Sequence, residues 1–245
     1  MILMIDWGNS YIKYLETDSL DSQNLDRAKV KRLEQSLELF KFISNQYELV
    51  LLASVRSDEE TNVLVESLKS YCSSIIIAKS GLPETFNSVY QNTQQMGVDR
   101  WLSMLALSSS DTRQLVVSCG TAITIDLLDC GRHIGGQIVP GLQLLTNSFN
   151  KTGKVNLTPL EIYGIQKGLG DSTQDCVEKG IYQLIEAYIS SIIKMLDDEK
   201  PISAIIFTGG GGQFWQGQFA MLKENTQYRE KLVFEGLADY YLNIK

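Results

Sequence analysis

Two short turns in this chain combine glycine with hydroxyl or amide side chains, a composition suited to binding phosphate. The segment LVVSCGTAITID at 115–126 turns at Gly120-Thr121, and the chain begins with ILMI followed by DWGNS. Both segments are typical of strand–turn–strand hairpins. Glycine has no Cβ, so the backbone N–H groups of such turns can approach a phosphate closely. A single Gly-Thr turn is more often only a turn, but the pair predicts one site held by two halves of a duplicated fold.

A second group of candidate residues follows Gly97. Asp99 and Arg100 stand at the start of an apolar helix expected over residues 101–107. The dipole of a helix favours an acid at this position for structural reasons alone. The functional alternative is a carboxylate held at the edge of a cleft, where it can act as a general base.

The chain has few residues or motifs suited to other kinds of catalysis or ligand binding. It has one histidine, His133, and four cysteines without a C-x-x-C pair, which argues against zinc sites and against Ser-His or Cys-His catalysis. The G-x-x-x-x-G-K-[ST] loop and a complete G-x-G-x-x-G fingerprint are absent. The run Thr208-Gly209-Gly210-Gly211-Gly212 is either a flexible turn or a bare backbone surface for a purine at a helix start.

Composition and charge limit the partners of the protein. The chain has 245 residues, of which 44% are apolar, and a net charge of −7, which disfavours nucleic acid and anionic membranes. The longest uncharged run, 201–222, holds five glycines and three glutamines and cannot span a membrane. The cysteines are expected to be reduced and buried. We therefore expect a cytoplasmic protein with no nucleic-acid and no membrane partner.

The elements that must position the candidate residues alternate between strands and helices. After the first hairpin, we expect a loop and an outer strand at 18–31 and an amphipathic helix at 33–45. Strands follow at 48–55 and 74–78, with a helix between them capped by Ser57 or Asp58. This alternation predicts an α/β half with a mixed sheet.

The second half repeats the pattern. A glycine-broken strand is expected at 133–140, a long helix from the cap residue Ser172, and a strand at 202–207. The apolar segment 232–234 and a terminal helix close the chain. The predicted halves are residues 1–113 and 114–245, an N-terminal and a C-terminal unit of the same kind.

Together these motifs resemble the type III pantothenate kinases, a family of the acetate-and-sugar-kinase/actin-like ATPase superfamily. The resemblance covers essentially the whole chain, because its motifs occur in the expected order and spacing. They are Asp6-Trp7-Gly8-Asn9-Ser10 with Lys13, Gly97-Val98-Asp99-Arg100-Trp101, Gly120 to Asp126, Gly135-Gly136 with Pro140-Gly141, Ser172-Thr173 with Gly180, Thr208-Gly209-Gly210, and Glu235-Gly236-Leu237-Ala238.

The resemblance implies both a fold and a reaction. The fold would be two actin-like, ribonuclease H-like halves with mixed sheets and a nucleotide cleft between them. The reaction would be ATP-dependent phosphorylation of pantothenate to 4'-phosphopantothenate, the first step of coenzyme A biosynthesis. The family also implies a homodimer, with the pantothenate pocket at the subunit interface.

The resemblance assigns roles to individual residues. Asp99 would accept the proton of the attacking hydroxyl, and Asp6 would help to hold the Mg²⁺ that accompanies ATP. The residues implied in ATP and phosphate binding are Asp6, Gly8, Asn9, Ser10, Lys13, Gly120, Thr121, Gly209 and Gly210. Those implied in pantothenate binding are Tyr90, Gly97, Val98, Asp99, Arg100 and Thr173.

The chain departs from the family pattern at two places. Ser118 stands where the family has an aspartate associated with a monovalent cation, K⁺ or NH₄⁺, so this metal position is in question. Asn92-Thr93 follow Tyr90-Gln91 where the family usually has a proline, which affects the expected shape of the pantothenate wall.

Two other functions stay open from the sequence. One is a kinase of the same superfamily with another small hydroxylated substrate, which the segment Gly97-Val98-Asp99-Arg100 disfavours. The other is a non-catalytic or regulatory relative that binds a nucleotide, which Ser118 favours. Turnover of ATP with pantothenate distinguishes the three.

Overall fold

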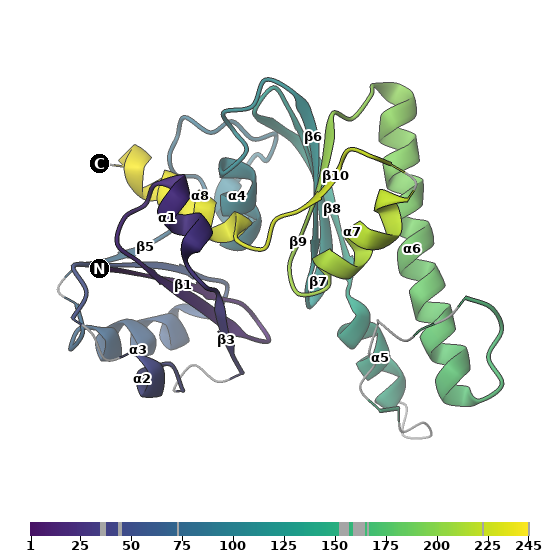
Figure 1. Cartoon of the computed structure of the whole chain (residues 1–245), viewed down its shortest axis with the longest axis horizontal. Coiled ribbons are helices and arrows are strands. Elements are labelled where there is room, and N and C mark those ends of the chain that lie inside the picture. The colour runs from purple at the N-terminus through teal and green to yellow at the C-terminus, as the bar shows by residue number, and fades with distance from the viewer. Residues whose placement is uncertain are drawn as a thin grey trace. The chain divides into compact units, whose positions relative to one another are not determined.

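The computed structural model describes the chain except for residues 35–37, 44–45, 73, 152–156, 159–164, 166, 222 and 245. The chain folds into two compact units, which Figure 1 shows coloured along the sequence. Unit 1 consists of Met1–Asp111, Cys130–Ile134 and Lys231–Lys245. Unit 2 consists of Thr112–Asp129 and Gly135–Glu230.

Unit 1 is built on a five-stranded mixed sheet of order β3-β2-β1-β4-β5. The strand β1 pairs antiparallel with β2 and parallel with β4. Its residues Leu3, Met4 and Ile5 are fully buried, as expected for a strand that is covered on both faces. The strands are β1 (Ile2–Trp7), β2 (Ile12–Thr17), β3 (Lys31–Leu33), β4 (Leu49–Ser54) and β5 (Ile75–Ile77).

Helices cover both faces of this sheet. On one face, α2 (Leu39–Phe42) and α3 (Asp58–Leu68) pack against apolar residues of β1 and β4. On the other, α8 (Leu232–Ile244) packs against β1, β4, α4 (Val98–Leu105) and α1 (Ser22–Arg27), as Figure 1 shows. The expected cap of α3 is present, since the Ser57 and Glu60 side chains form a reciprocal capping box.

Unit 2 is built on a sheet of order β10-β9-β6-β7-β8. The long helix α6 (Thr173–Glu199) and α7 (Gly212–Ala220) cover one face around a single apolar core, and α5 (Leu142–Asn150) packs against α6. Ser172 caps α6 as predicted, because its side chain accepts the N–H of Asp175. The strands are β6 (Arg113–Cys119), β7 (Ala122–Asp129), β8 (Arg132–Pro140), β9 (Ala204–Thr208) and β10 (Thr226–Tyr228).

The two units repeat one topology. In each, the first strand pairs antiparallel with the second and parallel with the fourth, and the fourth pairs parallel with the fifth. The strand β6 therefore corresponds to β1, and the segment Ser118-Cys119-Gly120 corresponds to Asp6-Trp7-Gly8. The prediction of a duplicated α/β fold with mixed sheets is confirmed.

Several elements differ from their predictions. The compact units differ from the expected halves, 1–113 and 114–245, because residues 130–134 and α8 pack into unit 1. The segment 232–234, which the prediction set apart from the terminal helix, is the first turn of α8. The region 18–31 contains α1, and the helix predicted at 33–45 is reduced to α2, with 35–37 and 44–45 outside the described residues.

Candidate functional site

The first candidate phosphate-binding turn joins β1 to β2 in unit 1. The Gly8 N–H donates to the carbonyl oxygen of Tyr11 at 2.9 Å and closes the turn. Asn9 and Ser10 are exposed at its tip. Arg56 donates from Nη1 to the Asn9 carbonyl oxygen at 3.1 Å, which fixes one side of the tip. The predicted hairpin is present, with its polar residues accessible.

Asp6 and Lys13 lie opposite each other on the two strands of this hairpin. They are register partners, and Lys13 Nζ lies 3.6 Å from Asp6 Oδ2. Burial raises the pKa of Asp6, the charge of Lys13 lowers it, and the negative charge of Asp99 raises it further. Asp6 is thus a buried carboxylate that interacts with a second carboxylate, an environment that a bound cation would relieve.

Asp99 lies in the first turn of α4, whose N-cap is Gly97. The Arg100 N–H donates to Asp99 Oδ1 at 2.9 Å. A Cβ on Gly97 would come within 2.6 Å of the same oxygen, so glycine gives this carboxylate its room. Val98 is buried beside it. The helix start therefore holds the Asp99 side chain in a defined orientation at the positive end of the helix dipole.

Arg100 is buried and lies against Tyr90. Only 6% of Arg100 is exposed, its Nη1 donates to Tyr90 Oη at 3.3 Å, and its guanidinium carbon lies 5.8 Å from the centroid of the Tyr90 ring. A buried charge needs such partners. The structure therefore brings Tyr90 and Arg100 together in unit 1 with Gly97, Val98 and Asp99.

In unit 2, three glycine-containing segments meet around the second candidate turn. Gly120 and Thr121 lie between β6 and β7, and the Gly141 N–H donates to the Thr121 carbonyl oxygen at 2.9 Å. The Gly211 N–H donates to the Cys119 carbonyl oxygen at 2.9 Å, which brings the segment after β9 to the same place. The result is a surface of backbone with few side chains.

Two of these glycines are required by their surroundings. Gly209 has a φ of 81°, and a Cβ there would lie 2.7 Å from the Cys119 carbonyl oxygen. A Cβ on Gly141 would lie 2.3 Å from the Gly120 carbonyl oxygen. Gly210 is exposed beside Gly209. Sequence reasoning did not assign Gly141 to the site, although the pair Pro140-Gly141 carried a signal for it.

Ser118 lies in a row of polar residues on one face of the unit 2 sheet. Its register partners are Thr124 on β7 and Thr208 on β9, which are both buried. The strand alternation places the buried Asp126 on this face, two residues from Thr124. Asp129 lies on the opposite face, where Lys200 Nζ is 2.6 Å from its Oδ2. Asp126 is therefore the carboxylate of β7 that shares the face of Ser118.

Thr173 is the first residue of α6 and is exposed. It belongs to unit 2, whereas the other residues expected to bind pantothenate belong to unit 1.

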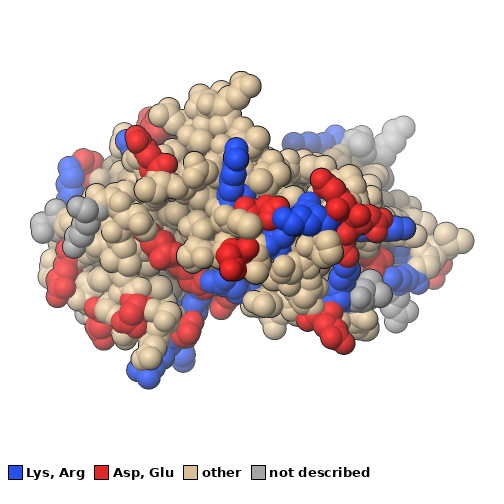
Figure 2. Space-filling view, turned by 90° about the horizontal axis from the view of Figure 1, so that it is seen from above, with Lys and Arg blue, Asp and Glu red and all other residues tan. Residues whose placement is uncertain are grey.

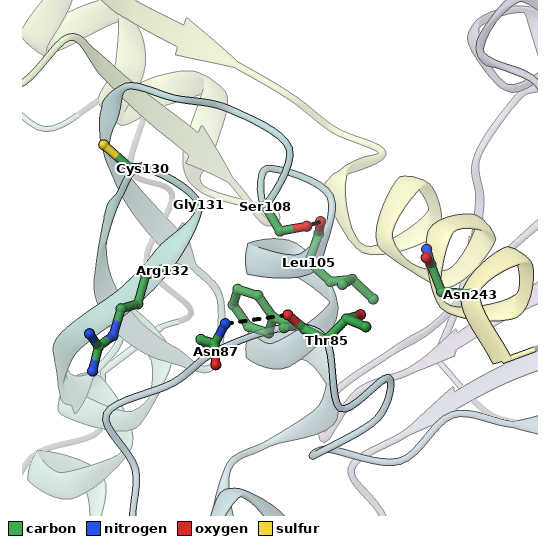
Figure 3. A pocket seen from close by; sticks show the side chains of 9 residues that line it. Thr85, Asn87, Leu105, Ser108, Cys130, Gly131, Arg132 and Asn243 are labelled. Atoms are coloured by element: carbon green, nitrogen blue, oxygen red, sulfur yellow. Dashed lines mark hydrogen bonds between the residues drawn. The ribbon is translucent and has the colours of Figure 1, made fainter.

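A cavity of about 200 Å³ in unit 1 lies apart from these residues. Figure 3 shows that two of its polar side chains are engaged locally, because Asn87 donates to the Thr85 carbonyl oxygen and Ser108 to that of Leu105. None of the predicted site residues lines it. Ligand pockets are commonly ~300–1,000 Å³, so this cavity is small for a substrate site.

The described part of the chain holds no group of three or more His, Cys, Asp or Glu side chains arranged to bind a metal. In that same part, no helix has the length and apolar character needed to cross a membrane. Figure 2 shows acidic and basic side chains next to each other over much of one face, rather than a broad basic surface.

Comparison with known proteins finds a family model and curated relatives that match most of the chain. The family model described as type III pantothenate kinase matches residues 2–195, a range that includes every predicted site residue except Gly209 and Gly210. A type III pantothenate kinase from Psychrobacter cryohalolentis is 30% identical over 98% of this chain and 98% of its own length.

Solved structures support the fold. A protein described as a Baf family transcriptional activator from Campylobacter jejuni superposes with a TM-score of 0.61, at 22% identity, over 98% of this chain and 97% of that one. A protein described as a 2-dehydro-3-deoxygalactonokinase from Sinorhizobium meliloti has a TM-score of 0.50, at 11% identity, over 100% and 99% of the two chains. The duplicated topology is thus that of the actin-like ATPase fold. From the family match, the relative along its whole length and this fold, we conclude that the chain belongs to the type III pantothenate kinase family.

Proposed function

We propose that this protein is a kinase that transfers the terminal phosphoryl group of ATP to the primary hydroxyl of pantothenate. The products are ADP and 4'-phosphopantothenate, and the reaction is the first step of coenzyme A biosynthesis. The family membership of the whole chain supports this function.

One observation of the structure carries the proposal furthest. Within unit 1 the carboxylates of Asp6 and Asp99 lie near enough for the charge of Asp99 to raise the pKa of Asp6. Asp99 directly precedes the buried Arg100, whose Nη1 donates to Tyr90 Oη at 3.3 Å. The carboxylate proposed to hold Mg²⁺ beside the phosphates therefore lies close to the segment proposed to bind the acceptor. Phosphoryl transfer requires this kind of positioning and charge neutralisation more than covalent catalysis.

Asp99 is the proposed proton acceptor. A carboxylate within hydrogen-bond reach of the attacking hydroxyl takes its proton as the bond to phosphorus forms, which is worth about 10²–10⁴-fold in rate for general bases. The single histidine of the chain is fully buried and cannot take this role without a rearrangement. Gly97, Val98, Arg100, Tyr90 and Thr173 are proposed to bind pantothenate.

The ATP phosphates are proposed to contact backbone N–H groups and Lys13. The residues proposed to lie at the phosphates are Gly8, Asn9 and Ser10 in unit 1 and Gly120, Thr121, Gly209 and Gly210 in unit 2. The N–H groups of Gly8 and Gly120 already bond to the Tyr11 and Ala122 carbonyl oxygens, so these two glycines allow close approach rather than supply a donor. Exposed turns with small residues let backbone N–H groups reach an anion.

Asp6 is the proposed protein ligand of Mg²⁺. The ion neutralises charge on the phosphates when it is bound with ATP. The residues fit such an ion, because Asp6 is a buried carboxylate whose pKa is raised, and Mg²⁺ is commonly held by one or two carboxylates together with phosphates rather than by a protein cage.

Ser118 is proposed to weaken activation by a monovalent cation. A serine hydroxyl offers an oxygen ligand but no charge, and cation affinity falls with the charge of the ligands. We expect lower activity or cation independence compared with a site that has an aspartate there. A titration of activity with K⁺ in the wild type and in Ser118→Asp tests this. An unchanged requirement for millimolar K⁺ in both proteins contradicts it.

We also propose that the protein is a cytoplasmic homodimer without nucleic-acid or membrane partners. The net charge of −7 supports the absence of nucleic-acid and anionic-membrane partners. Exposed apolar side chains on α6, Leu184 and Met195, support a second copy of the chain as the partner.

ADP release by the full chain, measured with and without pantothenate and at varied K⁺ or NH₄⁺, tests the proposed function. We expect ADP release to depend on pantothenate. Turnover with another hydroxylated molecule in its place indicates a different kinase of the superfamily. Binding of ATP without turnover of any acceptor indicates a regulatory relative.

A further inference from the structure

The single histidine of the chain lies next to Tyr90 in unit 1. His133 is fully buried, and its ring centroid is 5.6 Å from that of Tyr90, with 40° between the ring planes. His133 Nδ1 lies 2.8 Å from Ser88 Oγ, within hydrogen-bond distance. The imidazole therefore touches two residues of the segment that leads to the expected pantothenate wall.

The backbone holds these side chains together. Ser88 and His133 form a parallel β-bridge, in which the His133 N–H donates to the Asn87 carbonyl oxygen at 3.0 Å and the Val89 N–H donates to the His133 carbonyl oxygen at 3.1 Å. This bridge ties residues 87–89 to the start of β8, which is the part of β8 that belongs to unit 1.

Ser88 connects the histidine to Tyr90. The Tyr90 N–H donates to Ser88 Oγ at 3.2 Å, so one hydroxyl bonds to both residues. Tyr90 Oη in turn accepts from Arg100 Nη1 at 3.3 Å. A continuous path of contacts thus runs from His133 through Ser88 and Tyr90 to Arg100 at the start of α4.

We propose that Ser88 and His133 are positioning residues for pantothenate. They hold the ring of Tyr90 and, through it, the guanidinium of Arg100 in the orientation that binds the acceptor. This inference rests on the proposed function, because Tyr90 and Arg100 are the residues expected to contact pantothenate. Ordering a side chain before binding removes a cost that the ligand would otherwise meet, so the effect belongs to acceptor affinity rather than to the chemical step.

Two pairs of variants separate the contacts. His133→Phe keeps a ring beside Tyr90 and loses the bond to Ser88, whereas His133→Asn keeps a hydrogen-bonding group near the Nδ1 position and loses the ring. Ser88→Ala removes the hydroxyl, whereas Ser88→Thr keeps a hydroxyl at the same position. Ser67→Ala is the matched control, because Ser67 Oγ donates to the Val63 carbonyl oxygen on the exposed side of α3.

The steady-state constants for both substrates are the main measurement. Loss of one buried hydrogen-bond partner is expected to raise the KM for pantothenate about tenfold in Ser88→Ala and His133→Phe. The KM for ATP and kcat should stay within about twofold, and Ser88→Thr should restore the wild-type KM. A rise of both KM values together indicates a merely structural role and overturns the inference. An unchanged KM for pantothenate in both variants also overturns it.

A second measurement needs no variant that has to fold. Because His133 is the only histidine, untagged protein labelled with ¹⁵N-histidine gives the signals of one imidazole. Pantothenate added without ATP should shift these signals in the wild type, since the Tyr90 contact transmits the binding event. Unshifted imidazole signals at saturating pantothenate contradict the coupling.

The two proposals fail in different ways. Wild-type protein that releases no ADP with pantothenate removes the proposed function and this inference with it. Active wild-type protein whose Ser88→Ala and His133→Phe variants keep the wild-type KM for pantothenate removes this inference alone.

Discussion

Asp99 is the residue on which the proposed chemistry depends most directly. Its carboxylate is oriented by the Arg100 N–H and has room because Gly97 lacks a Cβ. It also interacts with Asp6, which lies on another element of unit 1. A base must be held in one place to receive a proton, and these contacts supply that restraint.

Replacement of Asp99 tests this role. Asp99→Asn removes the acceptor of the proton with little change in shape, so kcat is expected to fall about 10²-fold or more while the KM for pantothenate and the melting temperature change little. Asp58→Asn, an exposed acid in the first turn of α3, is the control for loss of a helix-dipole interaction. Near-normal kcat in Asp99→Asn would remove Asp99 from the role of base.

Asp6 gives a prediction about stability and pH. Because burial raises its pKa, the ionised form costs folding free energy above that pKa, and the cost disappears as the pH falls below it. At neutral pH, Asp6→Asn is therefore expected to melt at the same temperature as the wild type or a few degrees higher. Each kcal/mol gained in the free energy of unfolding raises the melting temperature by about 2–4 °C in a chain of this size. The difference should shrink as the pH is lowered.

Activity should move the other way in Asp6→Asn. Loss of the proposed Mg²⁺ ligand is expected to lower ATP turnover about 10²-fold. Thermal melting from pH 7 towards pH 4, with ADP release as the second measurement, gives both quantities. A variant that is less stable than the wild type at neutral pH and equally active contradicts this account of Asp6.

At the residue scale, the sequence predicted which residues belong to the candidate site more readily than which side chains contact each other. The family resemblance made Asp6 and Lys13 candidates, and the register places them opposite each other. The pairing of Ser88 with His133 was not predictable, because 45 residues separate them and the bond depends on how β8 meets the segment before Tyr90. Asn92, in the Asn92-Thr93 segment that departs from the resemblance, caps the short 3₁₀ helix Thr93–Gln95 by accepting the N–H of Gln94.

At the element scale, the glycine segments of unit 2 act as a close-packed group. The loop after β9 can approach the turn after β6 only because Gly209 has a positive φ and no Cβ. The same principle operates in unit 1, where a Cβ on Gly236 of α8 would lie 1.9 Å from the Leu102 carbonyl oxygen of α4. Glycine here allows backbones to touch.

Gly209→Ala tests the role of this close approach. The added methyl group meets the Cys119 carbonyl oxygen and disfavours the positive φ, which together should cost about 1–3 kcal/mol. We expect a lower melting temperature and a KM for ATP raised severalfold. Gly217→Ala in α7 is the control, because a Cβ there meets open space and alanine favours a helix. Equal melting temperatures and KM values in the two variants contradict the assignment.

The start of α8 shows why one element could not be assigned from the sequence. Leu232 to Phe234 form a short apolar run, and such a run does not distinguish a strand from the start of a buried helix. Its helical form follows from packing against α4, β1 and β4. By contrast, the strongly marked elements, such as β1 and the long helix α6 with its cap, were predictable because burial and capping agree with the local pattern.

At the scale of the whole molecule, the repeated topology accounts for the two candidate turns. Each unit places a turn after its first strand, so duplication supplies one phosphate-type hairpin in each. The units are not identical, because Ser118 occupies in unit 2 the position that Asp6 occupies in unit 1. The sequence predicted this repeat from the two hairpins, but the membership of α8 in unit 1 depends on tertiary packing.

The proposed homodimer is testable by mass in solution. Tyr182 of α6 is buried in the core of unit 2 and is not available to a partner. Leu184 and Met195 remain exposed. Light scattering at micromolar concentration is expected to give twice the chain mass of 27.5 kDa. A single mass of one chain contradicts the proposal.

The central claim is that this chain phosphorylates pantothenate. Mass spectrometry of the products formed by the full chain with ATP, Mg²⁺ and pantothenate tests it most directly. The account predicts a product heavier than pantothenate by one phosphoryl group, formed in the same amount as ADP and nearly absent with Asp99→Asn. ADP formed without this product, or bound ATP that is never consumed, would contradict it.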